Sequence, residues 1–471
     1  MKNIVPKYQS LESRTKNKVN ISDLFFLNVQ SKITPNNSNA ALSEKLIDQV
    51  KEALQSETEL IRNAFGNERR KEKLQKKILD IVSKPAFVES HKADLGTRRP
   101  FEVARIILEK LVGLDVLEQL RKDPNITDIK VINFDHIRVD HIHKGKYRTN
   151  LSFDSEKSYN ELLNRFAFAS SKPYSQGTPS YDAMFPQMRI NVVGFDLAKT
   201  PSLQLRSVSK QLRISRENMI ETGYLNQDMY NLLKLTFATH SHLFSGETGT
   251  GKTELFRYLA RYTKPKTDIV MIEDTPESYL DELYDLIQYS ITMWKNREAK
   301  GDSNSDFGYR YHLKNAMRQN FDYIFMQESR GAEMLDILKA LSTGHIVSST
   351  IHGKSAFGAI NRAIDLCQEA QMLSNEVYGK RLVGEDGFRI GIHVERFGEQ
   401  RVRKINQIVE YVDYKDGTTI GNVLFQYDEI KGVHVQKQPV SERLWNELLS
   451  YHKDLSSIAK LSPQKKALMS V

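Results

Sequence analysis

The chain has 471 residues, which is too many for one hydrophobic core and predicts two or three domains. Its 39% hydrophobic and 27% charged residues are typical of a globular protein, and its net charge of +9 suits a solvated basic surface or contact with nucleic acid or an anionic membrane. A single cysteine excludes an intramolecular disulfide framework and any zinc site that needs several thiolates.

Residues 1–95 predict a polar, helical N-terminal extension. The opening MKNIVPKYQSLESRTKNK lacks the apolar stretch of a signal peptide, and no run approaches the ~20 apolar residues of a membrane-spanning helix. We therefore expect a cytoplasmic protein, peripheral at the inner face of the cell membrane. Leu42, Leu46 and Val50 recur every four residues and predict helices between 42 and 83. The basic run ERRKEKLQKK is interpreted as a solvated helix face, with a docking surface as the alternative.

Residues 96–210 predict a smaller α/β domain. The segments FEVARIILEKLVG, LDVLEQLRK and SYNELLNRFAFAS have helical periodicity, whereas ITDIKVINFDHIRVDHIH, PQMRINVVGF and SLQLRSVS read as strands. His136, His141 and His143 raise the question of a metal site. Without a helical HxxxH pair nearby, a polar strand edge is the better interpretation.

Residues 211–225 predict a linker, 226–435 a second α/β domain and 436–471 a helical tail. In the second domain the strands HLFSG, TDIVMIED, DYIFMQE and HIVSSTIH alternate with helices, which predicts a mostly parallel sheet covered by helices. A loop around GDSNSDFG interrupts this alternation. Cys367, in AIDLCQEA, is expected on the buried face of a helix.

The segment GETGTGKT fits the phosphate-loop pattern G-x-x-x-x-G-K-[ST]. Its glycines let backbone N–H groups face anionic oxygens, its lysine can reach the β- and γ-phosphates, and its last hydroxyl, on Thr253, can bind Mg²⁺. A glycine-rich turn with an incidental lysine would not explain the strand before it and the helix after it. The predicted ATP-binding residues are Gly246, Glu247, Thr248, Gly249, Thr250, Gly251, Lys252, Thr253 and Glu254.

Two of the predicted strands end in acidic residues. TDIVMIED delivers Glu273 and Asp274, and DYIFMQE delivers Glu328. A strand-end carboxylate beside a bound nucleotide acts as a metal ligand or orients the attacking water, whereas elsewhere it caps a helix. Because the phosphate loop is present, we favour the functional interpretation.

These motifs, in this order, resemble the type II/type IV secretion ATPases, and most of all their CpaF/TadA branch. GETGTGKT resembles the Walker A loop, MIEDTPE the Asp box, HLKNAMRQNFDYIFMQESRGAEMLDILKAL the Walker B segment and STGHIVSSTIHGKS the His box. The resemblance implies that Glu273 is the catalytic carboxylate and that Glu328 is the Walker B acid, indirectly bound to the metal. Arg330 follows that acid, and the His box carries His345 and His352.

The resemblance extends over about residues 110–430. In the N-terminal domain it implies that Arg189 and Arg206 reach the nucleotide. It further implies a RecA-like ATPase domain, a homohexamer that uses ATP and Mg²⁺, and inner-membrane platform or channel proteins as partners. The chain departs from the family at Gln327, where glycine is usual, and at Gly353 and Lys354, where Ala-Asn is usual.

The leading hypothesis is therefore an ATP-hydrolysing motor subunit of a secretion, pilus-assembly or conjugative DNA-transfer machine. One alternative is a RecA-like motor that moves on nucleic acid. The leading hypothesis permits nucleic acid as a partner but does not require it. Another is a nucleotide-binding scaffold without turnover, which Gln327 keeps open.

Overall fold

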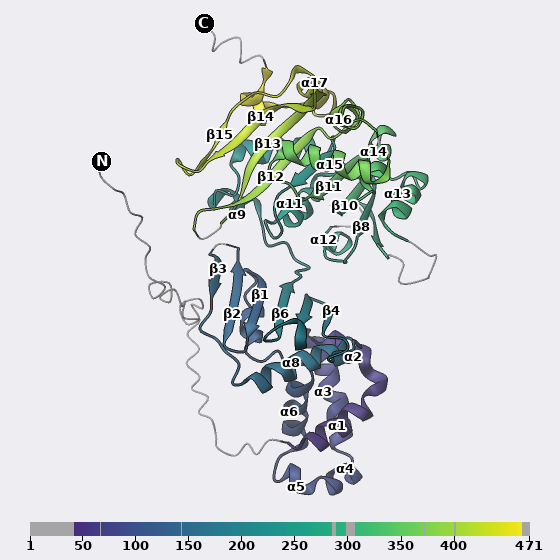
Figure 1. The fold of residues 1–471 in the computed structure, drawn as a ribbon, viewed down its shortest axis with the longest axis vertical. Coiled ribbons are helices and arrows are strands. Elements are labelled where there is room, and N and C mark those ends of the chain that lie inside the picture. Colours follow the sequence, from purple (N-terminus) through teal and green to yellow (C-terminus); the bar gives the residue numbers. More distant parts are fainter. Residues whose placement is uncertain are drawn as a thin grey trace, which may run out of the picture. The chain divides into compact units, whose positions relative to one another are not determined.

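The computed structural model describes residues 42–463 apart from 66, 143, 285–288, 298–306, 372, 400 and 401. The chain divides into two compact units, residues 1–209 and 210–471, and each is described by itself (Figure 1). His143 and most of the predicted GDSNSDFG loop lie outside the described residues. The finer division into five segments stays a prediction.

Most of the described helices of unit 1 bury one face, whereas α4 (Pro85–Ser90) has no buried residue. The other α-helices are α1 (Glu44–Ala53), α2 (Thr58–Ala64), α3 (Glu68–Val82), α5 (Lys92–Leu95), α6 (Pro100–Val112), α7 (Leu117–Arg121) and α8 (Glu156–Ala169). In α1 the four-residue spacing of Leu46 and Val50 puts both side chains in the core. Ser43 begins this helix, because its side chain accepts a hydrogen bond from the backbone N–H of Leu46.

The described strands of unit 1 form an antiparallel six-stranded sheet in the order β3-β2-β1-β6-β5-β4. They are β1 (Ile126–Asn133), β2 (His136–His141), β3 (Gly145–Arg148), β4 (Ser180–Phe185), β5 (Met188–Val193) and β6 (Ser202–Ser207). Alternation along β6 buries Leu203 and Leu205 on the face that the helices cover.

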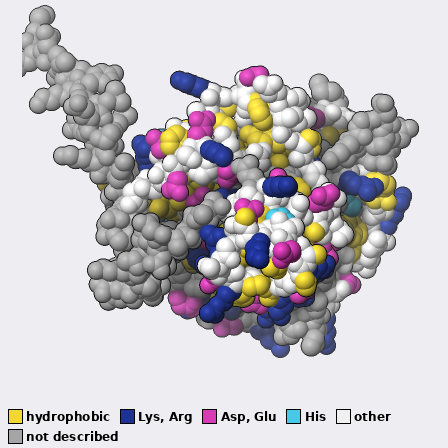
Figure 2. All heavy atoms as spheres, turned by 90° about the horizontal axis from the view of Figure 1, so that it is seen from below, with side chains coloured by type: hydrophobic (Ala, Val, Ile, Leu, Met, Phe, Trp, Pro, Cys, Tyr) yellow, Lys and Arg dark blue, Asp and Glu magenta, His cyan; other side chains and the backbone are white. Residues whose placement is uncertain are grey.

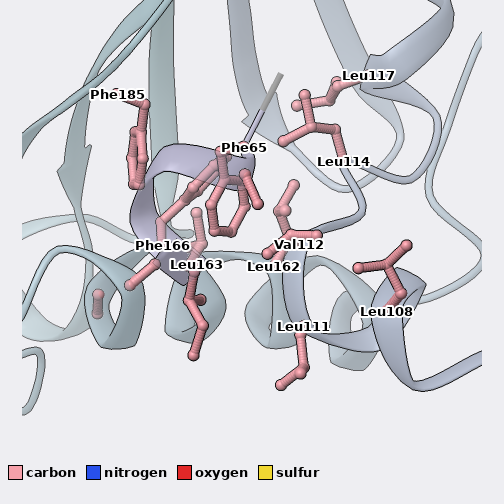
Figure 3. Close-up of a cluster of buried hydrophobic side chains, with 14 of the residues drawn as sticks. Phe65, Leu108, Leu111, Val112, Leu114, Leu117, Leu162, Leu163, Phe166 and Phe185 are labelled. Carbon is pink, nitrogen blue, oxygen red and sulfur yellow. The ribbon is translucent and has the colours of Figure 1, made fainter. Parts of the chain in front are cut away.

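One hydrophobic core joins the helices before residue 96 to the sheet that follows. Phe65, next to α2, lies with its ring centroid 5.3 Å from that of Phe166 in α8 and 4.8 Å from that of Phe185 in β4. Figure 3 shows these rings together with Leu162 and Leu163. All five side chains belong to one cluster, so the described N-terminal helices are part of the same packed unit as the sheet.

In unit 2 the described strands form a nine-stranded sheet in the order β15-β14-β13-β12-β7-β11-β10-β8-β9. They are β7 (His242–Ser245), β8 (Asp268–Glu273), β9 (Ser290–Lys295), β10 (Tyr323–Ser329), β11 (Ile346–Ile351), β12 (Ile390–Phe397), β13 (Val402–Lys415), β14 (Thr418–Asp428) and β15 (Val433–Gln436). Strands from β12 to β9 pair in parallel, and β12 to β15 pair antiparallel. The predicted mostly parallel α/β sheet is therefore confirmed.

Helices cover both faces of this sheet. They are α9 (Arg216–Glu221), α10 (Gln227–Phe237), α11 (Lys252–Leu259), α12 (Leu280–Leu283), α13 (Tyr309–Arg318), α14 (Met334–Ser342), α15 (Ala356–Ala370), α16 (Asn375–Val383) and α17 (Glu442–Tyr451). Phe244 and Phe325 face a cluster with α10 and α11, whereas their neighbours Leu243 and Ile324 face one with α13 to α16. Cys367 lies buried in the second cluster, as its helical context predicts.

Several elements differ from the sequence-based expectation. The unpredicted strands include β3, β4, β9, β12 and β15, and α9 lies inside the predicted linker, where Ser215 caps it. β9 pairs only with β8 at the end of the sheet, and its residues are half-buried or exposed, so no clear alternation marks it. Among the helices that the structure describes, none combines the length and apolar character that crossing a membrane needs.

Candidate nucleotide-binding site

The phosphate loop connects β7 to α11. Gly246 has φ +147°, and a Cβ on it would lie 2.2 Å from the carbonyl oxygen of Val394 in β12. Gly251, with φ +96°, immediately precedes α11. Glycine is required at both positions by the backbone conformation, and at the first also by the close approach of β12. The loop therefore ends at the amino terminus of a helix, where backbone N–H groups can bind phosphate.

Lys252, the first residue of α11, folds back over the loop. Its Nζ donates hydrogen bonds to the carbonyl oxygens of Gly246, at 2.7 Å, and Glu247, at 3.0 Å, and the residue is only 7% exposed. Thr250 closes the same turn by donating from Oγ1 to the Glu247 carbonyl at 2.9 Å. A cation held inside a ring of backbone groups fits an anionic ligand such as a triphosphate.

Parallel register brings the predicted acidic residues to the same edge of the sheet as the phosphate loop. Ser245 at the end of β7 lies opposite Ile351 in β11, and Met326 in β10 lies opposite Ile272 in β8. Glu273, Glu328 and His352 are one or two residues beyond these pairs, at the carboxyl ends of their strands. Ligands of open α/β sheets bind at this edge.

Glu273 is a buried carboxylate, 1% exposed, at the end of β8. Its Oε1 accepts hydrogen bonds from the backbone N–H groups of Glu277, at 3.2 Å, and Ser278, at 2.9 Å. Burial raises the pKa of Glu273 to about 7, even though these hydrogen bonds act in the opposite direction. A carboxyl group with a pKa near neutrality suits general-base chemistry.

Ionic contacts connect the second acid, Glu328, to the neighbouring loops. Its Oε2 accepts a hydrogen bond of 2.6 Å from Arg330 Nη2, and its Oε1 lies 2.7 Å from His352 Nε2. Arg330 Nη1 lies 3.6 Å from Asp274 Oδ2. The hydrogen bond that Arg330 donates to Glu328, together with the charge of that carboxylate, raises the pKa of Arg330. Four residues predicted from three motifs thus form one network, and its carboxylates offer the oxygen ligands that Mg²⁺ prefers.

Two further predicted residues continue the phosphate loop into α11, and a third lies away from the site. Thr253 and Glu254 follow in α11, where Glu254 Oε2 accepts from Arg257 Nη1 at 2.8 Å. His345 precedes β11, at the opposite end of the strand from His352, so the structure does not bring it to the carboxyl edge. Its Nδ1 lies 2.6 Å from the Phe321 carbonyl oxygen.

Arg189 and Arg206 belong to unit 1. They lie directly opposite each other on β5 and β6, and Arg206 Nε donates to Asp128 Oδ1 at 2.9 Å. Like charges so placed repel each other in the absence of acidic partners or an anion.

Residues of β12 and β13 that the sequence did not indicate also surround the phosphate loop. Arg396 Nη2 and Arg403 Nε donate to the carbonyl oxygen of Gly249, at 2.7 and 2.9 Å. His393 Nδ1 lies 2.9 Å from Ser245 Oγ, and burial together with the charge of Lys252 lowers the pKa of His393 to about 4. The arginines of the segment RFGEQRVR are the signal in the sequence that could have indicated this role.

Residues 178–385 match the model of the type II/IV secretion system protein family. Over this segment, the chain matches the type II/IV secretion superfamily. The matched segment contains the phosphate loop, the two acidic strand ends and the His box, so the family assignment and the site coincide. The CpaF/TadA branch within the family stays a prediction.

Proteins similar to this chain come from several bacteria. An uncharacterized protein of Bacillus anthracis is 27% identical over 356 residues, which cover 73% of this chain and 77% of that protein. A Mycobacterium tuberculosis protein provisionally named a conjugal transfer protein is 27% identical over 53% of this chain and 72% of its own length. Type II secretion system protein E of Pseudomonas aeruginosa is 28% identical over 46% of this chain and 41% of its own length.

Two solved structures are also similar. The ATPase DotB of Legionella pneumophila matches with a TM-score of 0.43 and 18% identity, over 61% of this chain and 77% of its own. The VirB11 ATPase of the Brucella suis type IV secretion system, in complex with sulphate, matches with a TM-score of 0.33 and 20% identity, over 62% of this chain and 93% of its own.

Proposed function

We propose that this protein is an ATP-hydrolysing motor subunit that powers a membrane-bound secretion, pilus-assembly or conjugative DNA-transfer machine. The observation that carries the proposal is the meeting of the phosphate loop with Glu273 and Glu328 at one edge of the sheet. The family match and the relative provisionally named a conjugal transfer protein support the proposal that the motor serves a machine of this class.

Each residue of the site has a distinct role in the proposed reaction. Lys252 and the loop N–H groups bind the β- and γ-phosphates, and Thr253 with Glu328 holds Mg²⁺ with its water shell. Bound Mg²⁺ supplies neutralising charge to the triphosphate. Glu273, with a pKa of about 7, keeps Oε1 on the following turn and accepts the proton of the attacking water through Oε2.

The remaining assignments rest on the resemblance. Arg189 and Arg206 are proposed to contact the nucleotide from unit 1, so that hydrolysis changes the separation of the two units. We further propose a homohexamer on the cytoplasmic face of the inner membrane, in contact with platform or channel proteins. The Glu328–Arg330–Asp274 network is positioned to respond to the γ-phosphate, because it joins the ends of β8 and β10.

Substitution of the phosphate loop tests the ATPase proposal. We expect the parent to hydrolyse ATP in the presence of Mg²⁺, and Lys252→Ala to lose both nucleotide binding and turnover. Binding of a fluorescent ATP analogue measures the first, and steady-state phosphate release measures turnover. Nucleotide binding without turnover in the parent, at any pH from 6 to 9, would favour the scaffold instead.

A motor on nucleic acid is the second candidate. On the face shown in Figure 2, Lys and Arg side chains are interspersed with Asp and Glu, whereas a nucleic-acid motor gathers basic residues into a stripe. Adding DNA at increasing salt separates the candidates, because a DNA motor's turnover rises with DNA and loses that stimulation steeply with salt. We expect turnover that does not depend on DNA.

A further inference from the structure

Gln327 is the residue at which this chain departs from its family in the middle of the candidate site. It lies in β10, directly before Glu328, and is half-buried. The family usually has glycine here, and glycine has no side chain with which to contact the neighbouring strand. The residue is therefore a feature of this chain that the family assignment does not explain.

The side chain of Gln327 binds the backbone of the turn that follows Glu273. Its Oε1 accepts hydrogen bonds from the N–H groups of Asp274, at 3.1 Å, and Thr275, at 3.4 Å. Its Nε2 donates to the carbonyl oxygen of Thr275 at 3.2 Å. A primary amide can donate and accept at once, which a carboxylate or an aliphatic side chain cannot do.

The same turn controls the catalytic carboxylate. Its later N–H groups, at Glu277 and Ser278, are the donors that hold Glu273 Oε1. Asn296, directly after β9, also supports the turn, because its Nδ2 donates to Asp274 Oδ1 at 2.6 Å and its backbone N–H donates to the Glu273 carbonyl at 2.6 Å. Gln327 and Asn296 thus hold the start of the turn from two sides, and its far end orients the carboxylate.

We propose that Gln327 is a positioning residue: it fixes the 274–278 turn and thereby holds the carboxylate of Glu273 in the direction that the attacking water requires. This inference rests on the proposed ATPase function. All three of the side-chain hydrogen bonds of Gln327 given above go to this turn. Glutamine in place of glycine therefore adds hydrogen bonds to the site and does not imply that the protein lacks turnover.

Gln327→Met tests the inference, because methionine keeps the length of the side chain and removes its hydrogen-bonding groups. We expect kcat for ATP hydrolysis to fall about ten- to a hundredfold while KM stays within about twofold, since a small displacement of a catalytic group lowers the rate of the chemical step. In ligand-free protein, hydrogen exchange of Asp274 and Thr275 should accelerate about tenfold or more, because both N–H groups lose their acceptor.

Thr350→Val is the matched control. Thr350 Oγ1 donates to the backbone carbonyl of Gln327 at 2.7 Å from β11, so the substitution removes a hydrogen bond to the same residue without touching the turn. It should leave kcat and the exchange of the 274–275 amides within about twofold of the parent. Gln327→Gly, a second variant with the residue usual in the family, should show the same exchange increase as Gln327→Met.

The outcomes separate the inference from the proposed function. Unchanged exchange at 274–275 in both Gln327 variants would overturn the inference, and so would accelerated exchange with an unchanged kcat. A parent that binds no nucleotide and shows no turnover would refute the ATPase function. The exchange measurement would in that case still decide whether Gln327 holds the turn.

Discussion

At the residue scale, the chemistry of the site depends on the environment of Glu273. A carboxyl group in water is fully ionised at neutral pH and is a weak base. Burial in unit 2 raises the pKa of Glu273 to about 7, and the N–H groups of Glu277 and Ser278 limit that rise. The protein therefore holds a carboxylate that is basic enough to accept a proton and still partly ionised near pH 7.

This pKa predicts the pH dependence of turnover. Because the base must be ionised, kcat should rise with pH and reach half of its plateau near pH 7. Glutamine cannot titrate, so the residual kcat of Glu273→Gln should not rise with pH in this way. It should lie about 10²- to 10⁴-fold below that of the parent. Steady-state hydrolysis from pH 5.5 to 9 measures both. A parent profile that is flat across this range would argue against Glu273 as the base.

The same shift predicts a change in stability with pH. Between pH 4.5 and about 7 the folded protein retains a proton on Glu273 that the unfolded chain releases, so stability falls as pH rises through this window. Glu273→Gln lacks this loss. Its free energy of unfolding, relative to that of the parent, should therefore be about 3 kcal/mol higher at pH 8 than at pH 4.5. Urea unfolding of unit 2 at the two pH values measures it. A constant difference between the two proteins would contradict the assigned cause.

At the element scale, the phosphate loop is shaped by the strand beside it as well as by its own glycines. Gly246 faces the carbonyl oxygen of Val394, so β12 limits which residue can follow β7. The sequence indicates the loop because its pattern is local. It could not indicate β12, because His393 and Arg396 lie almost 150 residues further along the chain and reach the loop only through sheet pairing.

Gly246→Ala should therefore abolish nucleotide binding. The added Cβ would lie 2.2 Å from a backbone atom, which cannot move aside as a side chain could, and φ of +147° is unfavourable for alanine. We also expect a loss of about 1–3 kcal/mol in the stability of unit 2. Gly177→Ala is the control, since a Cβ there meets only Ser175 Oγ at 3.9 Å. Nucleotide titration and urea unfolding distinguish the two variants, and equal binding by both would contradict the account.

Packing in unit 1 gives a second prediction at this scale. Phe65 joins α2 to α8 and β4, so Phe65→Ala should lower the stability of unit 1 by about 3–5 kcal/mol. Phe101, which is 58% exposed on α6, is the matched control, and its alanine variant should change stability by less than about 0.5 kcal/mol. Denaturant unfolding measures both. If Phe65→Ala melts only the N-terminal helices and leaves the sheet intact, the helices and the sheet do not share one core.

Hydrophobic pattern predicted most elements correctly, and the exceptions have physical causes. The strands β7, β8, β10 and β11 are short apolar runs in a buried parallel sheet, which composition alone identifies. β9 lies at the end of the sheet and lacks a buried face, so its sequence carries little signal. In the site, Glu273 and Glu328 were identified because strand ends are visible in sequence, whereas Asn296 and the contacts of Gln327 depend on which strands are neighbours.

At the scale of the whole molecule, we propose from the resemblance that the chain works as an assembly of six copies. The Arg189–Arg206 pair on unit 1 and the phosphate loop on unit 2 are each formed within one unit. We expect assembly into six copies when an unhydrolysed ATP analogue and Mg²⁺ are present, and dissociation to smaller species in Lys252→Ala. Sedimentation velocity measures the change. A parent that stays monomeric at every concentration with the analogue would refute the hexamer.

The central claim is that a triphosphate bound at the start of α11 is cleaved with the help of Glu273. Single-turnover hydrolysis of radiolabelled ATP, with the protein in excess over nucleotide, tests it most directly for the parent and for Glu273→Gln. The account predicts that both proteins bind ATP with similar affinity, that the parent converts it to ADP, and that Glu273→Gln retains it uncleaved for at least a hundred times longer. Cleavage at equal rates in the two proteins would contradict the account.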